Sequence, residues 1–226
     1  MRKFELNGIS LEIPEQCLSE TLVQAIDEGR YENNEAEAVL RNLNAKDRVL
    51  DLGAGAGYLS ILASEVVGRD NVTAVEPVPD MIPALRKNLD SNGAGNARVV
   101  HAAVVPKDHV GDTVKFLPRR AFWASEIASD SPVENPRVTS VPAVTICDLF
   151  ARFQPSFVIM DVEGSEAQLC REPWPEHVRI VVMEIHSKRY NSRTIQEIFD
   201  GMSASGLTYM PWGSRGETVV FQRVQT

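Results

Sequence analysis

The sequence predicts an α/β fold in which helices cover both faces of a doubly wound, seven-stranded sheet whose last strand is antiparallel. Apolar runs of strand length alternate with helical apolar stripes along most of the chain, and this alternation is typical of a largely parallel sheet. Two runs, 157–160 and 180–185, are almost wholly apolar, as expected of strands buried on both faces. A glycine-rich turn after an earlier run also favours this fold.

The segment 1–46 precedes the first strand of the predicted sheet. Within it, residues 4–13 alternate between apolar and polar side chains around Asn7-Gly8, which predicts a short hairpin. A helical stripe follows, formed by Ala36, Val39, Leu40 and Leu43. We expect this N-terminal segment to form a cap on the functional site.

Residues 49–58, Val-Leu-Asp-Leu-Gly-Ala-Gly-Ala-Gly-Tyr, form a predicted strand that runs into a glycine-rich turn. The glycines let the backbone turn tightly and lie flat against a ligand, where a side chain would collide with it. Apolar residues then recur at helical spacing from Leu59 to Val66, so the turn opens into an amphipathic helix. The predicted ligand contacts in this segment are Asp51, Gly53, Ala54, Gly55, Gly57 and Tyr58.

The spacing of these glycines is G-x-G-x-G. It differs from the G-x-G-x-x-G of dinucleotide-binding turns, because Tyr58 stands where the last glycine would be. The next predicted strand, 72–76, ends in Glu76, whose carboxylate can accept both hydroxyls of a ribose. Together these features suit an adenosyl ligand without a pyrophosphate. They predict S-adenosylmethionine as the cofactor, with its carboxylate near the N-terminus of the following helix.

The middle of the chain continues the alternation. Residues 81–92 form a predicted helix, with Asp80 at its N-cap and Gly93 after its end, and residues 98–105 form a predicted third strand.

Residues 106–142 are less regular than the rest of the chain. Residues 113–117 could form a strand, whereas the remainder mixes aromatic residues, charges and prolines. We expect this segment to be a substrate lid or recognition loop. Its Phe122 and Trp123 could stack on an acceptor or equally form a dimer contact.

The C-terminal quarter completes the predicted sheet. A helical stripe of Ile195, Ile198, Phe199 and Met202 precedes strands at 207–210 and 218–224, joined through residues 211–216. We expect these strands to pair as an antiparallel hairpin that closes the sheet.

Ionisable residues directly follow the two most apolar strands. The run Asp-Val-Glu-Gly-Ser-Glu occupies 161–166, and Met-Glu-Ile-His occupies 183–186. Because ligands of open α/β sheets bind beyond the carboxyl ends of the strands, we expect these side chains to converge on one crevice.

These two runs, in this order, resemble the FkbM family of S-adenosylmethionine-dependent methyltransferases. The resemblance covers most of the chain, although Ala56 and Pro79 depart from frequent family patterns. Its other landmarks are Gly29-Arg30-Tyr31-Glu32, the 51–57 motif, Glu76-Pro77, Asn88-Leu89, Asn92-Gly93, Thr145 and Asp148-Leu149.

The resemblance implies a class I methyltransferase (Rossmann-like) fold and, commonly, O-methylation of sugars or other small natural products. Beyond the glycine turn, the predicted cofactor contacts are Tyr31, Glu76, Pro77, Ala102, Ala103 and Asp161. Tyr31 next to a helix start could instead serve packing.

The implied mechanism is in-line transfer of a methyl group to a hydroxyl, with donor and acceptor aligned. The candidate catalytic residues are Asp161, His186 and Glu184, and Asp161 or His186 could act as the general base. Alternatively, His186 could hydrogen-bond the neighbouring loop, and Glu163 and Glu166 could cap the next helix. A divalent cation on Asp161, with Glu163 or Glu184, is possible but not favoured, so no metal site is predicted.

Composition limits the classes of partner. The 226 residues, 43% of them hydrophobic, suit one compact domain. A net charge of −8 gives no broad cationic surface, so a nucleic-acid partner is not expected. No apolar run fits a signal peptide or a membrane span. The three isolated cysteines indicate neither a disulfide framework nor a structural zinc site. A reducing compartment fits them best, so we expect a cytoplasmic protein.

The expected partner is a small-molecule or glycan acceptor, and a homodimer is possible. Two other classes of function stay open. A peptide or protein N-methyltransferase would use the same cofactor site with a more open groove. A non-catalytic adenosyl-binding or dehydrogenase-like module would show no methyl transfer, and Tyr58 argues against the dehydrogenase version.

Overall fold

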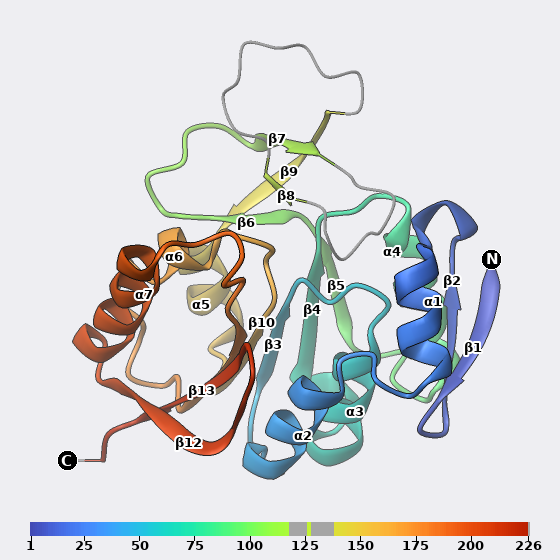
Figure 1. The fold of residues 1–226 in the computed structure, drawn as a ribbon, viewed down its shortest axis with the longest axis horizontal. Coiled ribbons are helices and arrows are strands. Elements are labelled where there is room, and N and C mark those ends of the chain that lie inside the picture. The colour runs from blue at the N-terminus through green and yellow to red at the C-terminus, as the bar shows by residue number, and fades with distance from the viewer. Residues whose placement is uncertain (118–125, 128–137, 226) are drawn as a thin grey trace.

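The computed structural model describes residues 1–117, 126–127 and 138–225. At its centre is a seven-stranded sheet in the order β12-β13-β11-β10-β3-β4-β5 (Figure 1). The parallel strands are β3 (Val49–Leu52), β4 (Val72–Glu76), β5 (Arg98–His101), β10 (Phe157–Met160) and β11 (Ile180–Glu184). The last strand, β13 (Thr218–Arg223), runs antiparallel between β11 and β12 (Leu207–Arg215). The predicted sheet is therefore confirmed.

Helices cover both faces of the sheet (Figure 1). One face carries α1 (Glu20–Asp27), α2 (Asn33–Asn42), α3 (Tyr58–Val67) and α4 (Met81–Ser91), and the other carries α5 (Ile146–Phe153), α6 (Glu166–Leu169) and α7 (Ser192–Ala204). Two 3-10 turns lie at Glu15–Cys17 and Arg69–Asn71. Alternate strand residues enter different apolar clusters: Val49 and Ile159 pack on the first face, Leu50 and Met160 on the second. Burial on both faces explains why the central strands are apolar throughout.

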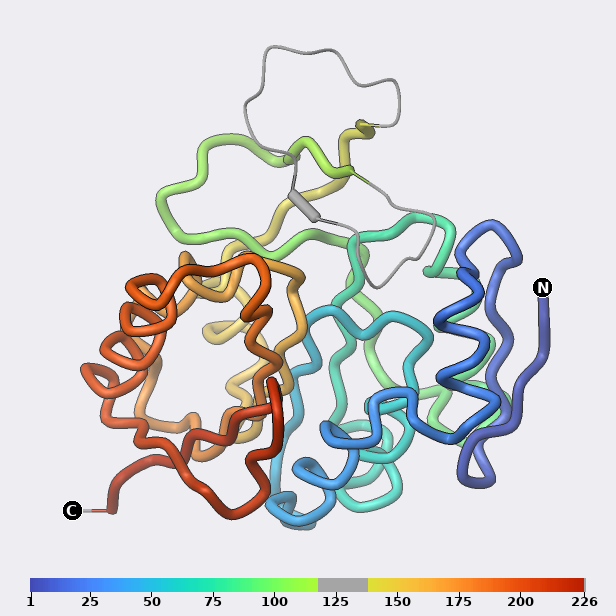
Figure 2. The backbone as a smooth tube through the Cα atoms, viewed as in Figure 1, coloured from blue at the N-terminus to red at the C-terminus, as the bar shows by residue number. Residues whose placement is uncertain are grey.

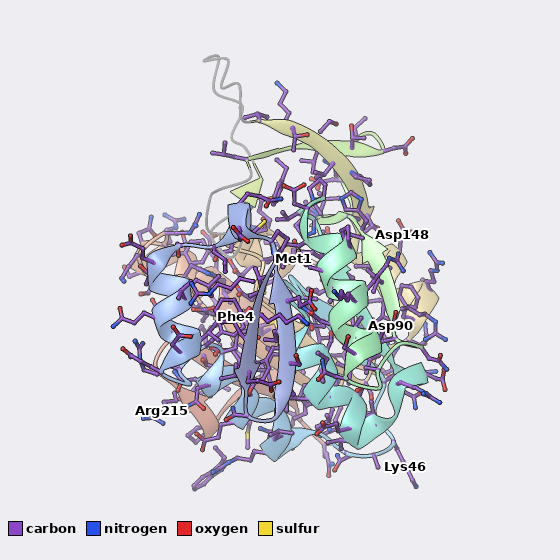
Figure 3. All side chains as sticks on the ribbon, turned by 90° about the vertical axis from the view of Figure 1, so that its right-hand side faces the viewer. Met1, Phe4, Lys46, Asp90, Asp148 and Arg215 are labelled. Atoms are coloured by element: carbon purple, nitrogen blue, oxygen red, sulfur yellow. The ribbon has the colours of Figure 1, made fainter. Side chains whose placement is uncertain are left out.

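The N-terminal hairpin has the predicted form. Strands β1 (Arg2–Leu6) and β2 (Ile9–Ile13) pair antiparallel around Asn7-Gly8 and lie between α1 and α4 (Figure 3). The buried amide of Asn88 holds the hairpin to α4. It accepts from the Glu12 N–H at 2.7 Å and donates to the Glu12 carbonyl at 3.1 Å and the Ala56 carbonyl at 2.9 Å. The hairpin is thus tied through α4 to the glycine turn.

The predicted third strand, 98–105, is wrong as a single element. The chain leaves the central sheet at Ala102, whose N–H still donates to the Glu76 carbonyl at 3.2 Å. Strand β4 ends at Glu76, so the chain beyond this point has no neighbour in the central sheet. Strand β6 (Ala103–Val105) pairs instead with β9 (Thr139–Thr145), in a parallel register.

Strand β6 starts a second, smaller sheet in the order β6-β9-β7-β8, which includes β7 (Thr113–Leu117) and β8 (Glu126–Ile127). It lies over the carboxyl ends of the central strands (Figures 1 and 2). The expected strand 113–117 is confirmed. The prediction for Phe122 and Trp123 lies outside the described residues.

Smaller differences concern the ends and faces of elements. Leu40 is 49% exposed, and Ala38 instead completes the buried face of α2. Asp80 holds the N-cap position of α4, but its side chain makes no capping hydrogen bond. Strand β12 extends past the predicted 207–210, with a shift in register between Met210 and Arg215. Within the described residues, no helix is both long and apolar enough to cross a membrane.

Candidate cofactor and acceptor site

A pocket opens over the carboxyl ends of β3, β4 and β10, at the edge of the sheet where the sequence predicts ligand binding. Its empty space, open solvent included, is about 600 Å³. Glu32 and Phe116 complete its wall from outside the central sheet. The predicted site residues that line it are Gly53, Gly55, Glu76, Pro77, Ala102, Ala103 and Asp161.

A smaller recess of about 340 Å³ adjoins this pocket and shares Glu32, Gly53 and Asp161 with it. Three further predicted residues line the recess: Asp51, Ala54 and Glu184. The structure thus brings most of the predicted residues to two connected spaces.

Three of the predicted cofactor contacts, and the candidate catalytic residue His186, line neither space. Tyr58 is buried at the start of α3, and its hydroxyl accepts a hydrogen bond from the side-chain amide of Asn7 at 2.7 Å. A Cβ on Gly57 would come within 2.6 Å of Leu85, so this glycine allows α3 to approach α4. The Tyr31 ring lies 6.2 Å from that of Tyr58. Their contact with a cofactor stays a prediction.

The hydroxyl of Tyr31 is buried without a hydrogen-bond partner among the described residues. Burial, together with the carboxylates of Glu32 and Asp161, raises the pKa of Tyr31 well above its usual range. A buried hydroxyl without a partner is unusual in a folded protein and is often satisfied by a ligand or water. Tyr31 lies next to Glu32, which lines both the pocket and the recess, but Tyr31 itself lines neither space.

Gly53 and Asp161 fix the tips of two strands against each other. The Asp161 N–H donates to the Leu52 carbonyl at 2.9 Å. A Cβ on Gly53 would lie 1.8 Å from the Asp161 carbonyl oxygen, and Gly53 has a φ of +88°. Only glycine meets both conditions, so the first glycine of the turn sets the position of the Asp161 backbone.

Glu76 holds the glycine turn by its carboxylate. One oxygen accepts the Gly55 N–H at 2.8 Å and the other accepts the Val78 N–H at 2.7 Å. Burial outweighs these bonds and raises the pKa of Glu76 to about 7. Each carboxylate oxygen can accept more than one hydrogen bond, so Glu76 keeps acceptor capacity for a ligand that enters the pocket.

The side of the pocket next to Asp161 is crowded with carboxylates. Burial, then Glu184 and Glu163, raise the pKa of Asp161 well above its usual range. Burial also raises the pKa of Glu184 to about 7 and that of Glu32 well above its usual range, the latter with help from the Asp51 charge. Burial is the first cause of all three shifts, and the charges of neighbouring carboxylates add to it.

His186 lies among three of these carboxylates. Its Nδ1 is 2.9 Å from Glu166 Oε1, and its Nε2 is 3.2 Å from Glu163 Oε2 and 3.4 Å from Asp161 Oδ1. Burial lowers the pKa of His186, but hydrogen bonds to Glu163 and Glu166 outweigh it and raise the pKa to about 11. A protonated imidazole cannot accept a proton, so this arrangement favours Asp161 over His186 as a general base.

Glu166 orients the histidine. Its side chain is fully buried, and its carboxylate accepts hydrogen bonds from the Gly164 N–H at 3.0 Å and from the Tyr190 hydroxyl, as well as from His186. Its neighbour Glu163 is held at a φ of +52°. Such a left-handed conformation is uncommon outside glycine and is often found at functional sites.

Comparison with known proteins agrees with this geometry. The family model described as the methyltransferase FkbM domain matches residues 51–206. The chain belongs to the FkbM methyltransferase domain family. It is thereby classed with the S-adenosylmethionine-dependent methyltransferases, as the sequence resemblance implied.

Curated relatives match the FkbM domain over shorter stretches. The protein-L-isoaspartate O-methyltransferase of Aeropyrum pernix is 38% identical over 91 residues, which is 38% of this chain and 31% of that protein. The ribosomal protein L11 methyltransferase of Acetivibrio thermocellus is 39% identical over 77 residues, 33% of this chain and 24% of that protein. The chain spans about a third or less of the length of these relatives.

Solved structures share the fold over nearly the whole chain. The methyltransferase FkbM of Methylobacillus flagellatus KT superposes with a TM-score of 0.52 at 17% identity, over 92% of this chain and 56% of that one. TYW2 of M. jannaschii, in complex with AdoMet, gives a TM-score of 0.51 at 14% identity, over 98% and 86% of the two chains. The FkbM domain thus has the class I methyltransferase fold.

Sequence reasoning missed some residues of this FkbM site. Phe116 lines the main pocket and Glu35 the recess. Phe116 lies in a strand that was expected, but no signal in the sequence indicates that this strand would line the pocket. Glu35 reads as an ordinary acidic residue in the first turn of α2.

Proposed function

We propose that this FkbM methyltransferase domain transfers a methyl group from S-adenosylmethionine to a hydroxyl group of a small molecule or sugar. The observation that carries the proposal is the position of Asp161. Its Oδ1 is buried and has no hydrogen-bond partner among the described residues, yet the residue lines both the main pocket and the recess. An unpartnered carboxylate oxygen there is suited to accept the proton of an acceptor hydroxyl.

The residues of the pocket fit the proposed cofactor. Glu76 has acceptor capacity for ribose hydroxyls, and Ala102, Ala103 and Phe116 offer apolar surface to a purine ring. The carboxylates near Asp161 would favour the positive sulfonium and ammonium groups. When bound, S-adenosylmethionine supplies an electrophilic methyl group. The protein's own part is to align the acceptor and to take its proton.

The charge of the site restricts the acceptor. Asp161, Glu163 and Glu32 all line the pocket, so an anionic acceptor would be repelled. A neutral hydroxyl is compatible with these carboxylates. A cationic amine would be attracted by them, and this observation keeps a peptide or protein N-methyltransferase as the second candidate.

The architecture also supports a role for the segments outside the central sheet. We infer that residues 1–226 act as one domain, with residues 1–46 as a cap and the described parts of 106–142 as a substrate lid or recognition loop. Glu32 of the first segment and Phe116 of the second both line the pocket. The thiols of Cys17, Cys147 and Cys170 are all free, which is compatible with the cytoplasm as the proposed location.

The test is a transfer assay with labelled S-adenosylmethionine and three matched acceptor panels that carry hydroxyls, amines or carboxylates. We expect label in the hydroxyl panel, and a loss of about 100-fold or more in the Asp161→Asn variant, while calorimetry still detects S-adenosylhomocysteine. Transfer to amines alone would replace the first candidate by the second. Cofactor binding without transfer to any panel would contradict both and favour a non-catalytic module.

A further inference from the structure

We propose that Asp161, Glu163 and His186 bind one divalent metal cation at the acceptor side of the pocket. Each offers one ligand atom, and these atoms lie within 4.8 Å of one another. Asp161 and Glu163 also line the pocket. A cation held by the three side chains would therefore face the space that the acceptor enters.

The orientation of His186 is that of a metal ligand. Its Nδ1 is bound to the buried carboxylate of Glu166, which is itself fixed by the Tyr190 hydroxyl and the Gly164 N–H. Metal-binding histidines usually donate their second ring nitrogen to a carboxylate in this way, and this fixes the ring for binding. The remaining nitrogen, Nε2, is directed at Asp161 and Glu163.

A second observation is independent of the histidine. The Oδ1 atom of Asp161 is shielded from solvent, and its distance of 3.4 Å from His186 Nε2 does not amount to a hydrogen bond. Buried polar atoms without a partner are rare, and a missing ion is one of their ordinary explanations. Glu163 has a left-handed backbone conformation, which is energetically unfavourable for a residue other than glycine. This conformation brings a second carboxylate to the same point.

One cation of the protein competes for this position. Arg189 lies 2.9 Å from Glu163 Oε2, the oxygen that also faces His186. A metal ion would have to share Glu163 with the guanidinium or displace it. Arg189 should therefore weaken the binding of the ion. A variant that removes its charge, Arg189→Gln, should bind the ion more tightly than wild type.

The ligand set indicates the class of ion. Two carboxylates and one imidazole suit Mn²⁺, Fe²⁺ or Zn²⁺ better than Ca²⁺, which takes six to eight oxygen ligands. Three protein ligands leave coordination positions open to the pocket. There the ion would lower the pKa of an acceptor hydroxyl and orient it, so with the ion bound Asp161 would act by holding the ion and not as a free base. This role rests on the proposed methyl transfer, whereas the binding of the ion does not.

The test is a titration of the purified full chain with Mn²⁺ in the absence of cofactor. Calorimetry and electron paramagnetic resonance monitor the binding. We expect one saturable site, with echo modulation from a directly bound imidazole nitrogen. Glu163→Gln and His186→Asn should abolish it. Glu166→Gln should weaken it by about 10-fold to 100-fold, Arg189→Gln should strengthen it, and Glu65→Gln on the exposed side of α3 should leave it unchanged.

The proposal is overturned if wild-type protein shows no saturable Mn²⁺ binding, or if the bound ion shows no imidazole nitrogen. The wild-type spectrum decides this even if a variant fails to fold. S-adenosylhomocysteine binding, measured separately, keeps the two proposals apart. Cofactor binding without Mn²⁺ binding would remove the metal site and leave the proposed function, and the reverse result would remove the function alone.

Discussion

At the scale of single residues, Gly53 decides where Asp161 lies. We expect Gly53→Ala to lower the free energy of unfolding by more than about 3 kcal/mol, because the new Cβ would overlap the Asp161 carbonyl at 1.8 Å. Urea denaturation of both proteins measures this. Gly93→Ala is the matched control, since Gly93 also has a positive φ but no atom within 4 Å of the added Cβ. It should cost about 1 to 2 kcal/mol. Equal losses of stability in the two variants would mean that backbone strain alone accounts for the effect of Gly53→Ala.

Asp51 gives a pH dependence whose direction follows from its burial. Burial outweighs the hydrogen bond from Ser60 and raises the pKa of Asp51 from 3.8 to about 6. Between these values the folded state binds more protons than the unfolded state, so this group lowers stability as pH rises through about 4 to 6.

Asp51→Asn removes this ionisation. We expect the variant to be as stable as wild type near pH 4 and more stable at pH 8, by on the order of 3 kcal/mol at most, since a pKa difference of one corresponds to about 1.4 kcal/mol. Thermal unfolding at both pH values measures the difference. Asp200→Asn, on the exposed side of α7, should show no such gain. A variant that is less stable than wild type at pH 8 would contradict the burial argument.

Glu76 holds the glycine turn and is also the predicted ligand of the cofactor ribose. We expect Glu76→Ala to weaken binding of S-adenosylmethionine and S-adenosylhomocysteine by roughly 1.5 to 3 kcal/mol, through loss of a charged hydrogen-bond acceptor. Calorimetric titration, with NADH as a control ligand, measures the change. Unchanged affinity would refute the prediction that Glu76, at the end of β4, binds the ribose hydroxyls.

At the scale of elements, local pattern predicted the central strands and their tips, because burial on both faces leaves a plain apolar signal. The 98–105 segment was predicted less well. Its residues read Arg-Val-Val-His-Ala-Ala-Val-Val, and both halves have equal strand character. The break at Ala102 depends on where β4 ends and on β9, about 40 residues away in the sequence. Such long-range pairing leaves no local signal.

Elements that lie far apart in sequence meet at Asn88. Asn88→Ala removes three buried hydrogen bonds and leaves the Glu12 N–H without this partner. We expect a loss of about 2 to 4 kcal/mol in the free energy of unfolding, together with faster hydrogen exchange in β2. Asn96→Ala is the control, since the Asn96 amide donates to Asp70 at the surface, and it should change stability by less than about 0.5 kcal/mol. Normal exchange in β2 of the Asn88 variant would show that apolar packing alone holds the hairpin.

At the scale of the whole molecule, composition predicted charge but not its distribution. The net charge of −8 gathers in part at the carboxyl ends of the strands. Arg48, Arg98 and Arg152 instead surround a hollow at the opposite, amino ends. Both groups of residues are spread along the sequence, so only the parallel sheet brings each of them together. The candidate site was predictable because its members follow strands, whereas Phe116 and Glu35 were not.

The distribution of charge also tests the expectation of no nucleic-acid partner. We expect the protein to pass a heparin column without retention at about 50 mM salt, because polyanion binding requires cations that neutralise phosphates. Retention that disappears in Arg98→Ala would contradict this expectation and would identify the arginine hollow as the binding surface. The same column run with Arg193→Ala, a surface arginine of α7, controls for the loss of one charge.

The departure of the chain at Ala102 also has a kinetic meaning. Ala102 and Ala103 line the pocket, and the same short stretch begins the sheet that carries Phe116. A ligand that fixes Ala102 and Ala103 would therefore also fix part of the small sheet that lies over the second ligand. We expect each ligand to bind more tightly in the presence of the other, by the same factor in both directions. Because tighter binding usually reflects slower dissociation, each bound ligand would delay the release of the other.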